Sequence, residues 1–180
     1  MIKGVPPTAA SQSVAPQTVS SQSDAQTQGI GAALARSLPA DPPARALRVY
    51  LQGELGAGKT TLVRGLLRAL GVSGAVKSPS YSLLESYVCP PWRVIHLDFY
   101  RLADPQDVLA LGLADHDERH ALWLIEWPER GESLLPKADL ILRLSGDAKA
   151  HSLAFEPCSE VGAQWLARVS QAPEFSNAGH

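Results

Sequence analysis

The chain has 180 residues, 45% of them apolar, which suffices for a globular domain with a hydrophobic core. A net charge of −2 and a pI of about 6.2 exclude any overall electrostatic attraction to nucleic acid. No run approaches about 18 apolar residues and no apolar segment follows the early lysine, so we expect no membrane span, no secretory signal and a cytoplasmic location.

Composition predicts an N-terminal extension, one domain and a tail. Residues 1–26 are rich in Ser, Gln, Ala, Thr and Pro, with few large apolar side chains, and are expected to be disordered. Residues 27–170 are expected to form a single domain, and residues 171–180 a flexible tail. Thr27 is the predicted N-cap of a first helix that ends at Leu38.

A glycine-rich motif follows a predicted strand at residues 47–51 and precedes a predicted helix at residues 61–70. The motif fits G-x-x-x-x-G-K-[ST], the phosphate-binding P-loop, in the strand–loop–helix context that it requires. Its glycines let backbone N–H groups turn toward phosphate oxygens, while the lysine reaches the β- and γ-phosphates and the threonine ligates Mg²⁺. The predicted nucleotide-binding residues are Gly53, Glu54, Leu55, Gly56, Ala57, Gly58, Lys59, Thr60 and Thr61. Lys59 is also a predicted catalytic residue. The motif therefore predicts that the domain at residues 27–170 is a P-loop ATPase that uses ATP and Mg²⁺.

The remaining elements alternate between strands and helices. The sequence predicts strands at 79–87, 92–98 and 121–125, and a helix from Asp104 to Gly112. A strand pair at 138–144 and 151–156 is followed by a helix at 160–169. This order predicts an α/β fold of the P-loop NTPase type, with a mixed, mostly parallel sheet flanked by helices.

Two carboxylates end predicted strands, where ligands bind in open α/β sheets. Asp98 ends an apolar strand in the manner of a Walker B element and is a candidate catalytic and Mg²⁺-positioning residue, with a helix-capping aspartate as the alternative. Glu126 ends the next apolar strand and is a candidate to ligate Mg²⁺ or orient the attacking water; an exposed strand-end glutamate is the alternative. His96 lies on the same strand face as Asp98, either to orient the carboxylate, to meet a phosphate or as a structural histidine. Trp127 is a candidate to stack on the nucleotide base or to serve as ordinary packing.

Four blocks carry a resemblance to a known family: GELGAGKTTLVRGLLRALG, SPSYSLLESY, HLDFYRL and LIEWPERG. In order and spacing they resemble the bacterial TsaE (YjeE) family over roughly residues 27–145. The resemblance implies a small ATPase that binds ATP with Mg²⁺ through Gly53 to Thr61, with Asp98 and Glu126 as acidic metal-site residues and Trp127 near the nucleotide. Ser80 stands where the family usually has threonine.

The same resemblance implies a pathway and partners. Members of the family work beside the TsaD and TsaB subunits, and together they help install threonylcarbamoyl on N6 of adenosine 37 in tRNAs that read codons starting with A. Contact with tRNA is thus expected to be indirect, through the complex.

Two other functions remain compatible with the residues. A P-loop small-molecule kinase needs an acceptor pocket and usually an arginine-rich lid, which the sequence lacks as a compact segment, although Arg101 or Arg130 could act singly. A nucleotide-sensing interaction module without useful hydrolysis fits because a P-loop indicates binding more surely than turnover. A guanine-nucleotide switch is disfavoured because neither N-K-x-D nor D-x-x-G is present. A segment at Ser78 to Tyr81 follows the P-loop helix and could sense phosphate or form a polar turn.

Overall fold

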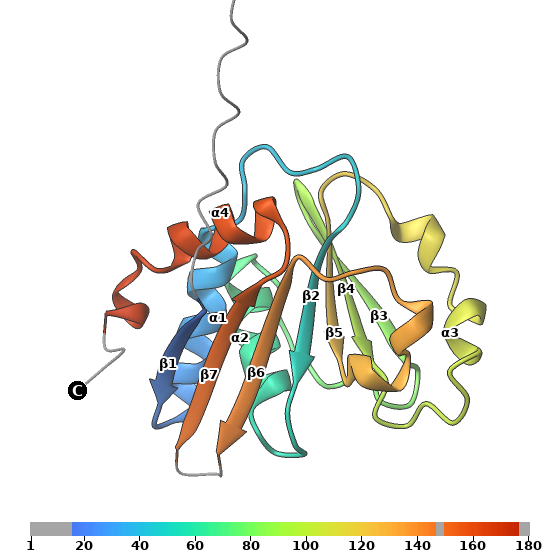
Figure 1. Ribbon diagram of the computed structural model, residues 1–180, viewed down its shortest axis with the longest axis horizontal. Helices are drawn as coiled ribbons and strands as arrows, with labels where there is room; N and C mark the ends of the chain where they lie inside the picture. Colours follow the sequence, from blue (N-terminus) through green and yellow to red (C-terminus); the bar gives the residue numbers. More distant parts are fainter. Residues whose placement is uncertain (1–15, 147–149, 177–180) are drawn as a thin grey trace, which may run out of the picture.

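The computed structural model describes residues 16–146 and 150–176, which form a seven-stranded mixed sheet with helices on both faces (Figure 1). The strand order is β1-β7-β6-β2-β5-β4-β3, and the four central strands β6, β2, β5 and β4 are parallel. Only β3 and β7 run against them, since β1 pairs antiparallel with β7. The predicted α/β fold with a mostly parallel sheet is therefore confirmed. The strands are β1 Gln17–Ser21, β2 Leu47–Gln52, β3 Leu84–Cys89, β4 Trp92–Asp98, β5 Ala121–Glu126, β6 Leu140–Gly146 and β7 His151–Pro157.

The helices form two unequal layers (Figure 1). The helices α1 (Asp24–Arg36), α2 (Lys59–Ala69) and α4 (Glu160–Val169) share one large core cluster with the sheet. The short helix α3 (Asp107–Ala110) packs on the opposite face with a smaller cluster. Four 3₁₀ turns complete the described structure: Leu113–His116, Pro128–Arg130, Glu132–Leu134 and Pro173–Phe175. None of the helices in residues 16–146 and 150–176 is long and apolar enough to cross a membrane.

Strand alternation decides which polar side chains face α2. Leu122 and Leu124 of β5 belong to the core cluster beneath α1, α2 and α4, so Glu126, two residues further on, faces the same layer. Val94 of β4 also belongs to that cluster, and the same period of two brings Asp98 to this face. Because Asp98 and Glu126 are register partners in the parallel β4–β5 pair, both carboxylates lie at one edge of the sheet.

Close helix contact fixes α2 in place. A Cβ added at Gly65 of α2 would lie 2.1 Å from the carbonyl oxygen of Gln28, and one at Gly31 of α1 would lie 2.1 Å from that of Leu62. Only glycine permits this approach of the two backbones. The helix that begins at the P-loop is therefore held against α1 along its length.

The N-terminal boundary differs from the sequence-based expectation. Disorder was expected through residue 26, but Gln17–Ser21 forms β1 and pairs with β7, with Val19 buried. Ser23, rather than Thr27, caps α1 by accepting a hydrogen bond from the Gln26 amide. Thr27 is instead buried, with its hydroxyl 2.8 Å from that of Ser21. Residues 1–15 lie outside the described part of the chain.

Other elements match the predictions or shift by a turn. The strand expected from residue 79 begins at Leu84, because a turn precedes it in which the Leu83 amide donates to the Pro79 carbonyl at 2.6 Å. The helix expected between Asp104 and Gly112 is reduced to four residues. The strands expected at 47–51, 92–98 and 121–125, the pair near 138–156 and the helix at 160–169 are present.

Part of the expected flexible tail is packed. Phe175 is buried, with its ring centre 5.0 Å from that of Phe155 on β7. Burial of a whole aromatic side chain outweighs the polar composition that suggested a loose end. Residues 177–180 fall outside the described residues.

Candidate functional site

The turn between β2 and α2 has the backbone of an anion-binding loop. Gly53, Gly56 and Gly58 have φ values of 140°, 83° and 93°, which L-residues with side chains rarely adopt. Helix α2 begins at Lys59 and has no side-chain cap. Its first N–H groups, which lack partners within the helix, are therefore available to an anion together with the positive end of the helix dipole.

Lys59 is buried inside this loop. Its Nζ donates to the carbonyl oxygens of Gly53 at 2.6 Å and Glu54 at 2.9 Å, and lies 4.2 Å from the centre of the Trp127 ring. Burial lowers the pKa of Lys59 below its ordinary value, and the nearby Glu126 carboxylate opposes that shift. Within the described residues it forms no ion pair within 4 Å. The ammonium group is thus positioned by neutral carbonyls and a π face, with its charge free to meet an anion.

Glu126 connects the P-loop helix to the sheet. The Thr60 hydroxyl donates to its two carboxylate oxygens at 2.9 and 3.0 Å. His96 Nε2 lies 2.9 Å from Glu126 Oε1, and both residues are buried. Among the alternatives for His96, this geometry favours orientation of a carboxylate, and the carboxylate is that of Glu126 rather than Asp98.

Asp98 occupies the tip of β4 beside Glu126. It accepts hydrogen bonds from the Ser78 hydroxyl and, at 2.8 Å, from the Tyr100 amide. Its side chain is almost fully buried, yet it has neither arginine nor lysine within ion-pair distance in the part of the chain that the structure describes. Asp98 and Glu126 therefore provide two adjacent carboxylates held by hydroxyl, amide and imidazole groups.

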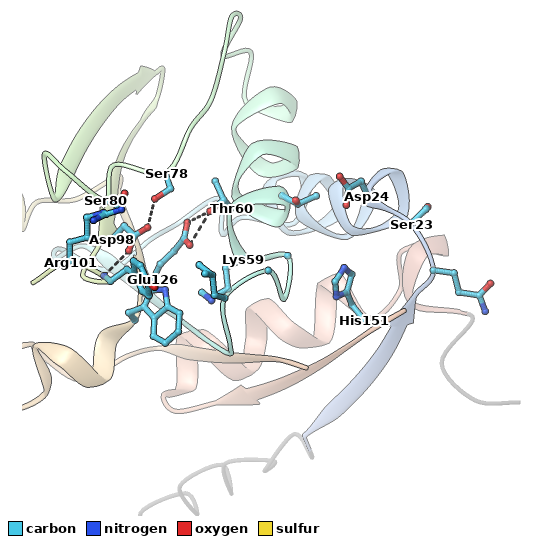
Figure 2. Close-up of a pocket in the computed structure, with 17 residues that line it drawn as sticks. Ser23, Asp24, Lys59, Thr60, Ser78, Ser80, Asp98, Arg101, Glu126 and His151 are labelled. Carbon is cyan, nitrogen blue, oxygen red and sulfur yellow. Dashed lines mark hydrogen bonds between the residues drawn. The ribbon is translucent and has the colours of Figure 1, made fainter. Parts of the chain in front are cut away.

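One cavity of about 950 Å³ at the carboxyl ends of β2, β4 and β5 is lined by Lys59, Thr60, Asp98 and Glu126 (Figure 2). Trp127, which follows Glu126, lines it too, as do Ser78 and Ser80. Most of the predicted loop residues reach the cavity: Leu55, Gly56, Gly58, Lys59, Thr60 and Thr61. Gly53, Glu54 and Ala57 do not line it; the first two supply the carbonyls that hold Lys59, and Ala57 is buried.

A second group of lining residues was missed by sequence reasoning. Gln22, Ser23, Asp24 and His151 border the cavity. Ser23, Asp24 and His151 lie on the side of Lys59 away from Asp98 (Figure 2). His151 reaches the P-loop because β7 pairs with β6 and β6 pairs with β2, the strand that precedes the loop, and its ring lies 3.6 Å from a Cβ position built at Gly58. Sequence gave no signal for this group, since the strand pairing that assembles it depends on β1.

The oxygen ligands at the Asp98 side fit Mg²⁺. Thr60, Asp98 and Glu126 offer one hydroxyl and two carboxylates, and Mg²⁺ is usually held by one or two carboxylates, substrate phosphates and water. No group of three or more His, Cys, Asp or Glu side chains forms a complete metal cage in residues 16–146 and 150–176. A site that needs phosphate oxygens to complete it agrees with both observations.

The strand–glycine turn–helix unit, with carboxylates on the two neighbouring strand tips, defines a protein of the P-loop NTPase fold class. The family model described as "Threonylcarbamoyl adenosine biosynthesis protein TsaE" matches residues 21–153. The chain belongs to the TsaE family.

Individual relatives agree with the family match. The chain is 46% identical over 100 residues to the tRNA threonylcarbamoyladenosine biosynthesis protein TsaE of Haemophilus influenzae, covering 56% of this chain and 63% of that protein. It is 32% identical over 99 residues to the protein of the same name from Bacillus subtilis, covering 54% of this chain and 61% of the relative. The matched region thus spans less than two thirds of the length of either relative.

A solved structure supports the fold. The crystal structure of Bacillus subtilis YdiB superposes with a TM-score of 0.70 at 24% identity, covering 88% of this chain and 96% of that one. The likeness extends beyond the P-loop region to nearly the whole described fold.

Proposed function

We propose that this protein binds and hydrolyses ATP with Mg²⁺ and thereby supports the TsaD–TsaB complex in N6-threonylcarbamoylation of adenosine 37 of tRNAs that read ANN codons. The proposed reaction takes place in the cytoplasm, and this protein contacts tRNA indirectly, through the complex. The observation that carries the proposal is one cavity in which Lys59 and Thr60 of a P-loop lie beside Asp98 and Glu126, in a chain of the TsaE family.

The P-loop residues would hold the triphosphate. Amides at the start of α2 and the Lys59 ammonium offer donors and positive charge to the β- and γ-phosphates. Trp127, whose ring already contacts the lysine, would cover the nucleotide. This part of the site accounts for binding.

The oxygen side chains would organise the reaction. Thr60 and Asp98 would hold Mg²⁺, which neutralises charge on the phosphate oxygens. Glu126 would complete the metal's surroundings or orient the attacking water, with His96 fixing the carboxylate from behind. Ser78 contacts Asp98 directly, so a change at the metal site would be passed to residues 78–81 and to a partner that binds them.

The test is a reconstituted modification reaction with TsaD, TsaB, ATP and tRNA. We expect repeated formation of threonylcarbamoyladenosine only when this protein is present. Lys59→Ala is expected to abolish that stimulation. Lys137→Ala, an exposed lysine that does not line the cavity, is the matched control and should retain it.

The outcome also separates the alternatives. If omission of the protein changes nothing, the proposed function is wrong, and phosphoryl acceptors become the next substrates to screen. If the protein stimulates the reaction without turning over ATP, it acts as a nucleotide-sensing module and the hydrolytic part of the proposal fails.

A further inference from the structure

Arg101 brings an unneutralised positive charge to the carboxylate end of the cavity. It lines the cavity with Ser78, Ser80 and Asp98, on the side of Lys59 opposite His151 (Figure 2). The residue is exposed and, over the stretches 16–146 and 150–176, forms no ion pair within 4 Å. Its charge is therefore available to a ligand.

The backbone fixes where Arg101 stands. It lies in a turn after β4 in which the Leu102 amide donates to the Phe99 carbonyl at 3.0 Å. Phe99 and Leu102 are both buried, and the Tyr100 amide is bound by the Asp98 carboxylate at 2.8 Å. Asp98, the proposed metal-site residue, thus fixes the position of the turn, and Arg101 follows it three residues further along the chain.

An exposed aromatic ring holds the guanidinium in this structure. The Cζ atom of Arg101 lies 4.4 Å from the centre of the Tyr81 ring and 6.0 Å from that of Tyr100. Tyr81 is 84% exposed, so it is not fixed by burial in the core. An exposed cation–π contact is weaker than charge-assisted hydrogen bonds to phosphate. A phosphate group within reach would therefore draw Arg101 away from Tyr81.

We propose that Arg101 is the protein's own phosphate-contacting arginine, held on Tyr81 until a nucleoside triphosphate binds and then paired with the terminal phosphate. This inference rests on the proposed function. The P-loop fixes the direction of the phosphate chain: Thr60 and the two carboxylates mark the terminal phosphate, and Arg101 lies at that end. It would stabilise charge on the terminal phosphate oxygens as water attacks phosphorus and the bond to the bridging oxygen breaks, leaving ADP, inorganic phosphate and a proton.

The proposal also gives Tyr81 a role in signalling. Ser78 is tied to Asp98 and Tyr81 to Arg101, so both ends of the segment 78–81 contact residues at the terminal phosphate. Transfer of Arg101 to phosphate would release the Tyr81 ring. The released Tyr81 ring would therefore signal at the protein surface that a triphosphate is bound.

The experiment compares Arg101→Ala, Arg101→Lys and Tyr81→Leu in the full chain with TsaD and TsaB. We measure kcat for ATP hydrolysis and Kd for ATP and ADP. Arg101→Ala is expected to lower kcat on the order of 10²-fold and to reduce the preference for ATP over ADP, with ADP affinity unchanged. Arg101→Lys, which retains charge without the planar donor fork, should recover only part of kcat.

Two controls separate chemistry from packing. Arg68→Ala is matched, because that arginine is also exposed and forms no ion pair within 4 Å among the described residues, but does not line the cavity; its kcat should equal that of the wild type. Tyr81→Leu removes the resting contact and should keep kcat within about twofold while ATP affinity stays equal or rises.

Each result decides between the two proposals. Wild-type kcat and ATP preference in Arg101→Ala would overturn the assignment of Arg101 and leave the proposed function intact. An equal loss of kcat in Tyr81→Leu and Arg101→Ala would also overturn it, because the contact between the two residues would then act only by stabilising the loop. Absence of ATP binding by the wild-type protein would overturn both proposals.

Discussion

Two polar clusters lie at opposite ends of the same parallel strands, and they are built differently. At the amino ends, Asp139 accepts two hydrogen bonds from Arg45 at 2.7 Å each, one from the Arg48 amide at 2.9 Å and one from the Ser159 hydroxyl at 2.6 Å. Asp117 Oδ2 accepts a hydrogen bond from the Arg48 guanidinium at 2.7 Å. We call these residues the amino-end cluster; each of its carboxylates is paired with an arginine, and only Arg48 Nε among its described side-chain atoms is buried without a hydrogen-bond partner.

The carboxyl-end cluster consists of Lys59, Thr60, His96, Asp98 and Glu126. Its carboxylates are held by hydroxyl, amide and imidazole groups, and its lysine by backbone carbonyls. Lys59 forms no ion pair within 4 Å with Asp98 or Glu126, and the cluster borders a cavity of about 950 Å³. Paired charges of this kind stabilise a fold, whereas charges left without an ion-pair partner beside a cavity are typical of a ligand site.

The largest expected effect is the loss of stability in Asp139→Ala. The Asp139 side chain is 1% exposed, so the change leaves several donors without an acceptor. We expect the free energy of unfolding in urea to fall by about 3 kcal/mol, near the lower end for a broken buried pair because Arg45 can reach water. ATP binding by the folded fraction should be unchanged. A loss of affinity without a loss of stability would reverse the roles of the two clusters.

Lys59→Met tests the carboxyl-end cluster. Removal of a buried charge whose pKa is lowered by burial should leave the free energy of unfolding unchanged or higher. ATP affinity, measured by titration calorimetry, should fall at least about 100-fold, which corresponds to about 2.7 kcal/mol. Affinity equal to that of the wild type would contradict the P-loop assignment.

Acid should weaken the amino-end cluster through Asp139. Burial alone would raise the pKa of Asp139, but hydrogen bonds from Arg45, Ser159 and the Arg48 amide outweigh it and hold the pKa below the ordinary 3.8. The stability that Asp139 contributes is thus complete above pH 3.8 and is lost as pH falls through the lower, folded-state pKa. Unfolding free energy measured from pH 5 downward should fall less steeply in Asp139→Asn than in the wild type; parallel curves would contradict this account.

The smallest expected effect concerns Trp127. Trp127→Phe keeps an aromatic face over Lys59 but weakens the cation–π contact seen at 4.2 Å. ATP affinity should fall about two- to threefold, with no change in turnover at saturating ATP. A 100-fold loss would show that the indole makes a specific contact that the ring face alone does not explain.

Sequence predicted the carboxyl-end cluster better than the cavity around it. Lys59, Thr60, Asp98 and Glu126 were found because a contiguous motif and two strand tips identify them locally. The His96–Glu126 contact needed the β4–β5 register, in which His96 pairs with Leu124. His151 was missed, because its place beside the P-loop depends on the pairing of β7 with β6 and of β6 with β2.

The missed strand β1 has a physical reason. Its residues are polar except for Val19, and its regularity comes from pairing with β7 rather than from a strong hydrophobic pattern. The amino-end cluster was likewise invisible, because Arg45 and Asp139 lie far apart in sequence and meet only where β2 and β6 start side by side. Local patterns predict elements, whereas these contacts arise from the packing of distant ones.

The central claim is that the carboxyl-end cluster hydrolyses ATP, and the most direct measurement is ATP turnover and ATP binding by Glu126→Ala with TsaD and TsaB present. The account predicts retained binding with hydrolysis reduced on the order of 10²-fold, because the variant keeps the P-loop and loses the carboxylate that Thr60 and His96 hold. An unchanged hydrolysis rate would contradict the account and remove Glu126 from the catalytic residues.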